Sequence, residues 1–176
     1  MVILRLSSKP SDQGITESKV GKIDKSHIII EFSGQIEELI AHFAELGYLI
    51  TGKIDYAIEQ IMNDLNNIRL EMMTPGIENL TRFNVEWMEQ NVEQFKSHIK
   101  IKNEGLPFAN NLSAAKANII KCKVRQAERC FYRLIKDVPV NELIGKYLNH
   151  LDHYMELLFL LLNVVHKNIV EKEEKR

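Results

Sequence analysis

The sequence predicts an all-α protein, a five-helix antiparallel bundle preceded by an irregular N-terminal arm. Apolar residues recur at three- and four-residue steps from residue 34 almost to the C-terminus, which is the spacing of a half-buried helix. Glycine and proline, 8 and 4 of 176 residues, are too few to interrupt this periodicity often. Hydrophobic residues make up 45% of the chain, which excludes disorder throughout and suffices for one core.

The first 33 residues differ from the rest, and we expect them to form an arm of their own. Residues 7–14 (SSKPSDQG) have the composition of a polar, turn-rich loop. Residues 27–32 (HIIIEF) are typical, in isolation, of a short β-strand. The predicted division is therefore an arm over residues 1–33, a bundle over residues 34–170 and a charged tail over residues 171–176.

Three helices open the predicted bundle, and turn residues separate them. The first begins after Gly34 and ends at Gly47. The second begins near Thr51 and stops at residues 74–76 (TPG), because proline and glycine end helices. The third spans residues 80–99 and precedes a loop.

Two further helices complete the prediction. Ser113 is the expected N-cap of the fourth helix, and Pro139 is expected in the first turn of the fifth, where proline is tolerated. Residues 157–162 (LLFLLL) are apolar around the whole helix, so they need burial on every side. A subunit interface is favoured over burial within the bundle, because a small bundle leaves one face of a terminal helix open.

The net charge and the cysteine content limit which kinds of binding partner and which compartment we expect for this protein. Lysine plus arginine total 23 and aspartate plus glutamate total 24, and this net charge of −1 offers no general reason to bind nucleic acid or an anionic membrane. No apolar stretch approaches the roughly 18 residues of a membrane span, and no targeting segment is evident. Cys122 and Cys130 are expected as free thiols in a reducing compartment, the cytoplasm.

Two groups of polar residues on the helices are candidate sites, each with a plainer alternative. Lys121, Arg125 and Glu128 share one face of the fourth predicted helix, as surface ion pairs or as a cationic site for phosphate; spacing alone favours ion pairs. His150 and His153 either bridge a metal or stay exposed, and exposure is favoured. No histidine has a glutamate three residues before it, which argues against a di-iron carboxylate bundle.

The N-terminal loop is a third candidate site. Its small and hydroxylated residues suit the approach of an anion to backbone N–H groups, its lysines add donors, and its aspartate can recruit hydrated Mg²⁺. No Walker loop is present, and the alternative is a flexible polar arm. The residues concerned are Ser8, Ser11, Asp12, Gly14, Thr16 and Lys22.

Five segments carry, in order and at matching spacing, versions of motifs that occur together in one family. They are residues 8–16 (SKPSDQGIT), 19–22 (KVGK), 30–39 (IEFSGQIEEL), 121–129 (KCKVRQAER) and 148–155 (LNHLDHYM). They resemble Thr-x-Thr-Gly-Asp-x-Gly-x-Thr, Arg-Val-x-Lys, Val-Glu-Ala-Tyr-Gly-x-Val-Asp-Glu-Leu, Arg-x-x-x-Arg-Arg-Ala-Glu-Arg and Leu-Asn-Arg-Leu-Ser-Asp-Tyr-Leu. These are motifs of the ATP:cob(I)alamin adenosyltransferase family of the propanediol-utilisation type, whose fold is a five-helix bundle.

The resemblance implies a reaction and a site. It implies transfer of the 5′-deoxyadenosyl group from ATP to cob(I)alamin, with release of triphosphate, between the subunits of a homotrimer. It implies Mg²⁺ held through the ATP phosphates, Arg125 and Lys22 beside the triphosphate, and Glu128 orienting arginine. Glu37 and Lys121 are the implied ion pair near ATP. Further implied binding residues are Asn149, Tyr154 and Phe108, with Ser8, Ser11, Asp12, Gly14 and Thr16 of the loop.

The chain departs from the family motifs at several positions. Ser11 replaces the first loop glycine, and Gln126 replaces the second arginine of the arginine pair. His150 and His153 replace an arginine and an aspartate, and Glu104 stands where the family has a phenylalanine that helps to displace the corrinoid's lower ligand. Two alternatives therefore stay open: a relative that binds ATP or corrinoid as a sensor or carrier, and a helical interaction protein that binds neither.

Overall fold

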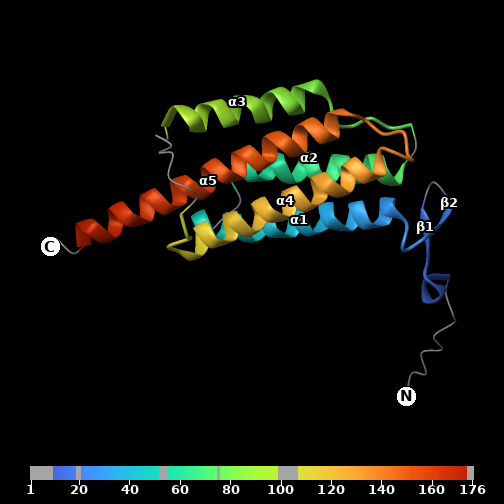
Figure 1. Cartoon of the computed structure of the whole chain (residues 1–176), viewed down its shortest axis with the longest axis horizontal. Helices are drawn as coiled ribbons and strands as arrows, with labels where there is room; N and C mark the ends of the chain where they lie inside the picture. Colours follow the sequence, from blue (N-terminus) through green and yellow to red (C-terminus); the bar gives the residue numbers. More distant parts are fainter. Residues whose placement is uncertain (1–9, 19–20, 52–54, 75, 99–106, 174–176) are drawn as a thin grey trace, which may run out of the picture.

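The structure, a computed structural model, describes residues 10–18, 21–51, 55–74, 76–98 and 107–173. These residues form a bundle of five long helices, which confirms the predicted all-α class (Figure 1). The helices are α1 (Ile28–Thr51), α2 (Tyr56–Met73), α3 (Arg82–His98), α4 (Leu112–Leu134) and α5 (Leu143–Glu173). The arm holds a 3-10 helix, η1 (Pro10–Gln13), and two antiparallel strands, β1 (Ile15–Ser18) and β2 (Gly21–Asp24).

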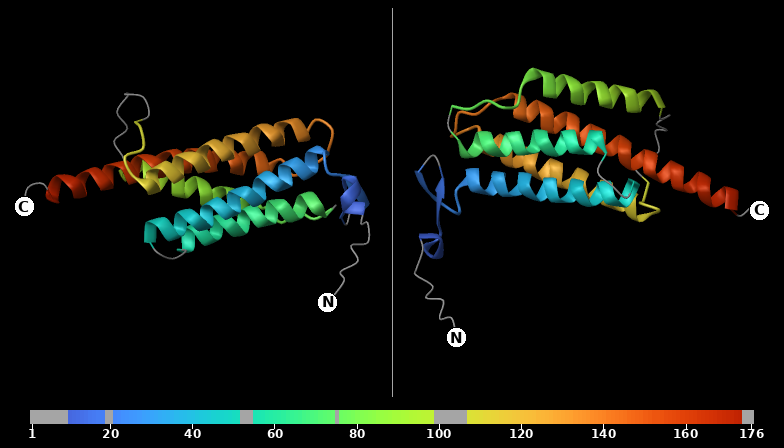
Figure 2. Two further views of the ribbon diagram at one scale, coloured as in Figure 1. Left: turned by 90° about the horizontal axis from the view of Figure 1, so that it is seen from below. Right: turned by 180° about the vertical axis from the view of Figure 1, so that it is seen from behind.

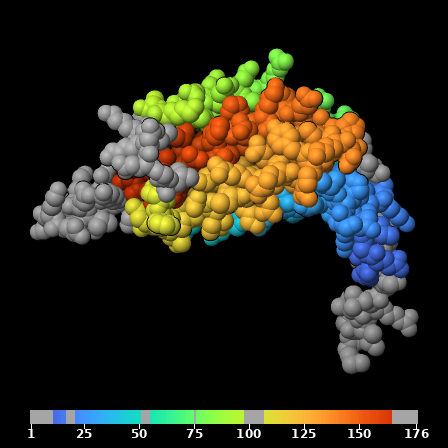
Figure 3. All heavy atoms as spheres, viewed as in Figure 1, coloured from blue at the N-terminus to red at the C-terminus, as the bar shows by residue number. Residues whose placement is uncertain are grey.

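Helix α4 joins the two halves of the bundle. It packs against α5 on one side and α1 on the other, while α2 packs on α1 and α3 packs on α5. Helix α5 extends past the other helices at the end of the bundle opposite the arm (Figure 2). Helices α4 and α5 therefore lie side by side over much of the molecular surface (Figure 3). None of the helices in the described ranges combines the length and apolar character that crossing a bilayer requires.

The apolar stripes expected from sequence spacing form the core. Each helix contributes side chains that are almost fully withdrawn from solvent, among them Phe43, Leu65, Met88, Val124 and Leu151. Burial of one such side chain stabilises the fold by roughly 1.5–3 kcal/mol. Packing of these stripes, more than the helix propensity of single residues, therefore holds the bundle together.

Helix α1 begins at Ile28, so the prediction of a β-strand over residues 27–32 is wrong. Phe32 and Ile36 are both fully buried at a four-residue step, and this burial overrides the β propensity of the isoleucine run. Gly47 does not end the helix either, because α1 continues through it to Thr51. A single glycine inside a helix costs only about 1 kcal/mol and does not by itself terminate it.

Asparagine side chains, which the sequence prediction did not single out, shape both ends of the α4–α5 pair. Asn111 caps α4 by accepting a 2.8 Å hydrogen bond from the Ala114 N–H, so the prediction of Ser113 as N-cap is wrong. Pro139 does not open α5, which begins at Leu143 after Asn141 accepts a 3.0 Å bond from the Leu143 N–H. An Asn oxygen on extended backbone satisfies an N–H group that the first helical turn cannot.

Candidate functional site

Arg125 on α4 faces two carboxylates of α5. Its Nε donates to Asp152 Oδ1 at 2.8 Å, and its Nη2 donates to Glu156 Oε2 at 3.3 Å. The Asp152 bond is the largest cause of a raised pKa of Arg125, which therefore remains a cation. The Arg125 side chain is 44% exposed whereas that of Asp152 is 11% exposed. The pair therefore presents its positive member to solvent.

Glu128 lies one turn further along α4 and is half-buried. Its pKa is raised, first by burial and then by the negative charge of Asp152. The resemblance implies that Glu128 orients arginine, and this role stays a prediction. The hydrogen bonds that Arg125 donates go to Asp152 and Glu156, two carboxylates that the family motifs do not indicate.

Lys121 lies one turn before Arg125 and is only 3% exposed. Its Nζ lies 5.7 Å from the centroid of the Phe159 ring, a cation–π contact. Within the described parts of the chain, no ion pair joins Lys121 to a carboxylate. Glu37, its implied partner, is exposed on α1, and the neighbouring Glu38 pairs with Lys123 at 2.7 Å.

The arm is more regular than predicted, because β1 and β2 form a hairpin. Thr16 pairs with Ile23 in its register, and Lys22 in β2 is exposed. Gly14, with φ of 76°, makes the turn between η1 and β1, a conformation that favours glycine. Lys25 Nζ donates to the carbonyl oxygen of Ser11 at 2.8 Å and ties η1 to the end of the hairpin. The first turn of the candidate anion loop thus has a defined shape.

Other residues of the candidate site lie elsewhere in the arm and bundle. Asp12 is exposed in η1, Asn149 is exposed on α5, and Ser8 lies outside the described residues. Tyr154 is buried in the core, where its ring stacks on that of Phe95 at a centroid distance of 4.9 Å. Burial, the largest cause, raises the pKa of Tyr154.

Phe108 is 99% exposed and precedes α4, at the end of the bundle opposite the arm (Figure 1). A single copy of the chain therefore does not bring Phe108 and the arm together. Glu104, the residue at the position of the family's phenylalanine, lies outside the described residues.

The two histidines of α5 and the two cysteines of α4 are separate features. His150 is half-buried and His153 is exposed, and no three His, Cys, Asp or Glu side chains gather as a metal site in the described ranges. Cys122 is exposed and Cys130 is buried, and both are free thiols, as expected.

Asp152 and Glu156 are the site residues that sequence reasoning missed. Their spacing of four residues on α5 placed them on one helix face, which was the available signal. Which residue of α4 meets that face depends on the register of the two helices, and spacing within α5 carries no information about that register.

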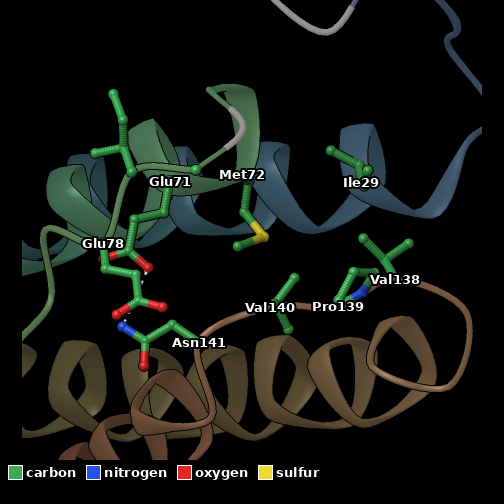
Figure 4. A pocket seen from close by; sticks show the side chains of 10 residues that line it. Ile29, Glu71, Met72, Glu78, Val138, Pro139, Val140 and Asn141 are labelled. Atoms are coloured by element: carbon green, nitrogen blue, oxygen red, sulfur yellow. Dashed lines mark hydrogen bonds between the residues drawn. The ribbon is translucent and has the colours of Figure 1, made fainter.

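A cavity of about 640 Å³ lies away from this face, between the ends of α2, the start of α1 and the α4–α5 connection (Figure 4). Glu71 accepts hydrogen bonds there from the backbone N–H groups of Asn79, at 2.5 Å, and Leu80. Asn141 Nδ2 donates to Glu71 at 3.3 Å and to the Leu80 carbonyl at 2.8 Å. These bonds join α2, α3 and α5, and none of the predicted site residues lines the cavity.

Comparison with known proteins finds one family. The family model described as cobalamin adenosyltransferase matches residues 6–165. A cobalamin adenosyltransferase of Cupriavidus metallidurans is 25% identical over 169 residues, which cover 93% of this chain and 89% of the relative. A corrinoid adenosyltransferase of Mycobacterium tuberculosis is 26% identical over 175 residues, covering 92% of this chain and 89% of the relative.

Solved structures with the same fold come from Lactobacillus reuteri. One is a variant PduO-type ATP:co(I)rrinoid adenosyltransferase complexed with ATP, with a TM-score of 0.83, 17% identity and coverage of 92% of this chain and 96% of that chain. Another variant, complexed with cobalamin and ATP, has a TM-score of 0.79, 17% identity and coverage of 93% and 96%. At this identity the likeness establishes the bundle fold.

Proposed function

Because the chain belongs to the cobalamin adenosyltransferase family, we propose that it transfers the 5′-deoxyadenosyl group of ATP to cob(I)alamin. The electron pair of the substrate's cobalt(I) forms a bond to C5′ of the ribose, and the C5′–O bond breaks. Triphosphate leaves with the electron pair of that bond. The observation that carries the proposal is the family match over residues 6–165, together with the exposed cation Arg125 on the matched α4 segment.

The leaving group decides what the protein must supply. Triphosphate carries several negative charges, so cations directed at it stabilise the transition state. Arg125 and Lys22 are the exposed cations we assign to it, and Asn149 is the proposed hydrogen-bonding partner of the nucleotide. Mg²⁺ arrives with the ATP phosphates, and Asp12 in η1 offers a carboxylate to its hydration shell.

We place the site between subunits of a homotrimer. Lys121 supports this proposal, because it is 3% exposed and pairs with no carboxylate among the residues that the structure describes, and an unpaired buried charge is costly. The exposed Glu37 of a second copy supplies the missing carboxylate. Leu160, Leu161 and Leu162 of α5 are half-buried in the single chain and gain further burial in an assembly. The free thiols Cys122 and Cys130 support a reducing, cytoplasmic location.

A catalytically impaired relative that carries or senses ATP or corrinoid is the second candidate. Phe108 favours it, because this ring is 99% exposed and forms no apolar wall in the single chain. The substitutions Ser11, Gln126, His150 and His153 favour it as well. In this alternative the bundle and ATP binding are retained and the transfer is lost.

An anaerobic assay tests the proposal. Chemically reduced cob(I)alamin, Mg-ATP and purified protein are mixed and followed by visible absorbance, with Glu89→Gln as a variant that removes one exposed carboxylate from α3, a helix that carries none of the proposed site residues. Conversion to adenosylcobalamin at a rate proportional to protein, for both proteins, supports the enzyme. ATP binding by calorimetry without conversion supports the carrier or sensor, and the absence of both contradicts the two candidates.

A further inference from the structure

The two carboxylates that contact Arg125 are not equivalent. Asp152 is 11% exposed and makes the 2.8 Å bond to Nε, whereas Glu156 is 35% exposed and makes the longer 3.3 Å contact to Nη2. A short charge-assisted bond that is shielded from water is stronger than a long one in solvent. Glu156, with its longer side chain, is therefore the partner that an incoming anion displaces more readily.

The guanidinium keeps most of its donor capacity. Arginine carries five N–H donors in a fixed plane, and the hydrogen bonds within the described chain use two of them. Asp152 holds the Nε edge from the α5 side, and this contact sets the plane of the whole group. The whole side chain is 44% exposed, so a phosphate can approach the guanidinium and accept from the three remaining donors.

The position of this carboxylate differs from the family motif. The family motif has serine followed by aspartate where this chain has Asp152 followed by His153. Successive helix residues point about 100° apart, so the exchange moves the negative charge to another face of α5. The whole residue Asp152 is buried, with 8% of its surface exposed, and its carboxylate faces Arg125 of α4, whereas His153 is exposed.

We propose that Asp152 is the positioning residue for Arg125: it fixes the guanidinium plane so that the outer N–H donors meet the triphosphate. The triphosphate displaces the Glu156 carboxylate from its contact with Nη2. This inference rests on the proposed function. Asp152 touches no substrate and acts through Arg125 alone. The family motif assigns no such role to the position of Asp152.

Simple electrostatics and positioning predict opposite results for Asp152→Asn. Removal of a negative charge near a phosphate site tightens Mg-ATP binding if charge alone matters. The neutral amide oxygen of asparagine accepts a weaker bond from Nε than the carboxylate does, so the guanidinium is held less firmly, and we expect the dissociation constant for Mg-ATP to rise about tenfold. Glu156→Gln makes the same charge change beside the same arginine and is expected to tighten binding. Glu89→Gln controls for the loss of an exposed carboxylate on α3, which carries none of the proposed site residues.

A double-mutant cycle separates positioning from a general structural effect. Arg125→Lys keeps the positive charge and lacks Nε, so Asp152→Asn should change ATP affinity less than about twofold in that background. Asp152→Glu, which keeps a carboxylate, should restore part of the affinity. The full-length chain is used, with Mg-ATP titrated by calorimetry and thermal unfolding recorded for every variant.

Each outcome decides the proposal. A tenfold loss in Asp152→Asn that disappears in the Arg125→Lys background supports it. Unchanged or tighter binding in Asp152→Asn, or an equal loss in both backgrounds, overturns it while the proposed function stands. A wild-type chain that binds no Mg-ATP overturns the proposed function, and this inference with it.

Discussion

Among the cation–carboxylate pairs of helix α4, one that faces α1 and one that faces α5 are inverted with respect to each other. On the face toward α1, the Lys116 side chain is 9% exposed while its partner Glu45 is 59% exposed. On the face toward α5, Arg125 is 44% exposed while Asp152 is 11% exposed. Each pair joins a basic side chain to a carboxylate. The basic side chain is the buried member in the Lys116 pair, whereas the carboxylate is the buried member in the Arg125 pair.

The inversion separates a structural pair from a pair suited to bind an anion. Lys116 is enclosed by His42, whose Nδ1 lies 2.6 Å from its Nζ, and by Glu45. Two of its three donors contact these partners, and the member of the pair that meets solvent is negative, so this pair does not favour an approaching phosphate. Arg125 meets solvent with donors to spare, so the α5 face is the one that offers N–H donors to the proposed phosphate. Burial of one partner, rather than the presence of an ion pair, decides what a helix face can bind.

When Arg125 and Lys116 are each replaced by methionine, we expect the larger effect on ATP affinity or turnover at Arg125. Arg125→Met removes the exposed cation, and we expect ATP affinity or turnover to fall at least about tenfold, because a charge-assisted contact is lost. Calorimetry with Mg-ATP and the anaerobic assay measure the effect. Unchanged values in both would remove Arg125 from the site.

Lys121, another cation of α4, should behave like neither of these two pairs if a second copy of the chain supplies its carboxylate partner. Glu37→Lys places two lysines together at the proposed interface, and we expect turnover to fall several-fold through like-charge repulsion. Lys121→Glu in the same chain should restore part of that turnover. Sedimentation analysis reports the assembly, and a double variant no better than Glu37→Lys contradicts the pairing.

Lys116→Met is the matched substitution on the structural face. It keeps the aliphatic stem that packs in the bundle, and Glu45 is exposed enough to be solvated without its partner. We expect ATP affinity within about twofold of wild type and a melting temperature within about 3 °C. A loss of affinity as large as that of Arg125→Met would end the distinction between the two faces.

The smallest expected effect is the pH dependence of the stability that the Lys116–Glu45 pair contributes. The hydrogen bond from Lys116 is the largest cause that lowers the pKa of Glu45 below its ordinary 4.5. A lowered carboxylate pKa contributes stability that is present above 4.5 and is lost as the pH falls through the folded-state value. The difference in melting temperature between wild type and Lys116→Met should therefore be largest near neutral pH and shrink in acid. A difference that grows in acid contradicts this reading.

Spacing in the sequence found the helix stripes and the candidate residues of α4. Val124 and Leu151, which lie at this spacing, are fully buried, because a period of 3.6 residues forces one face inward. The same spacing placed Arg125 on the polar face of α4 and favoured ion pairs there, which Arg125 forms with Asp152 and Glu156. The strand expected at residues 27–32 failed, because β propensity is weak against the burial of Phe32 in a helix.

The sequence by itself determined the helical class, the buried stripes and the set of charged residues that α4 offers. Only the tertiary structure decided which carboxylate meets which cation: Asp152 instead of Glu128 for Arg125, and Glu45 for Lys116. The physical reason is that spacing along one helix is local, whereas pairing depends on the register and rotation of a second helix packed against it. The exposure of each partner, which separates a phosphate-facing cation from an enclosed one, follows from that packing as well.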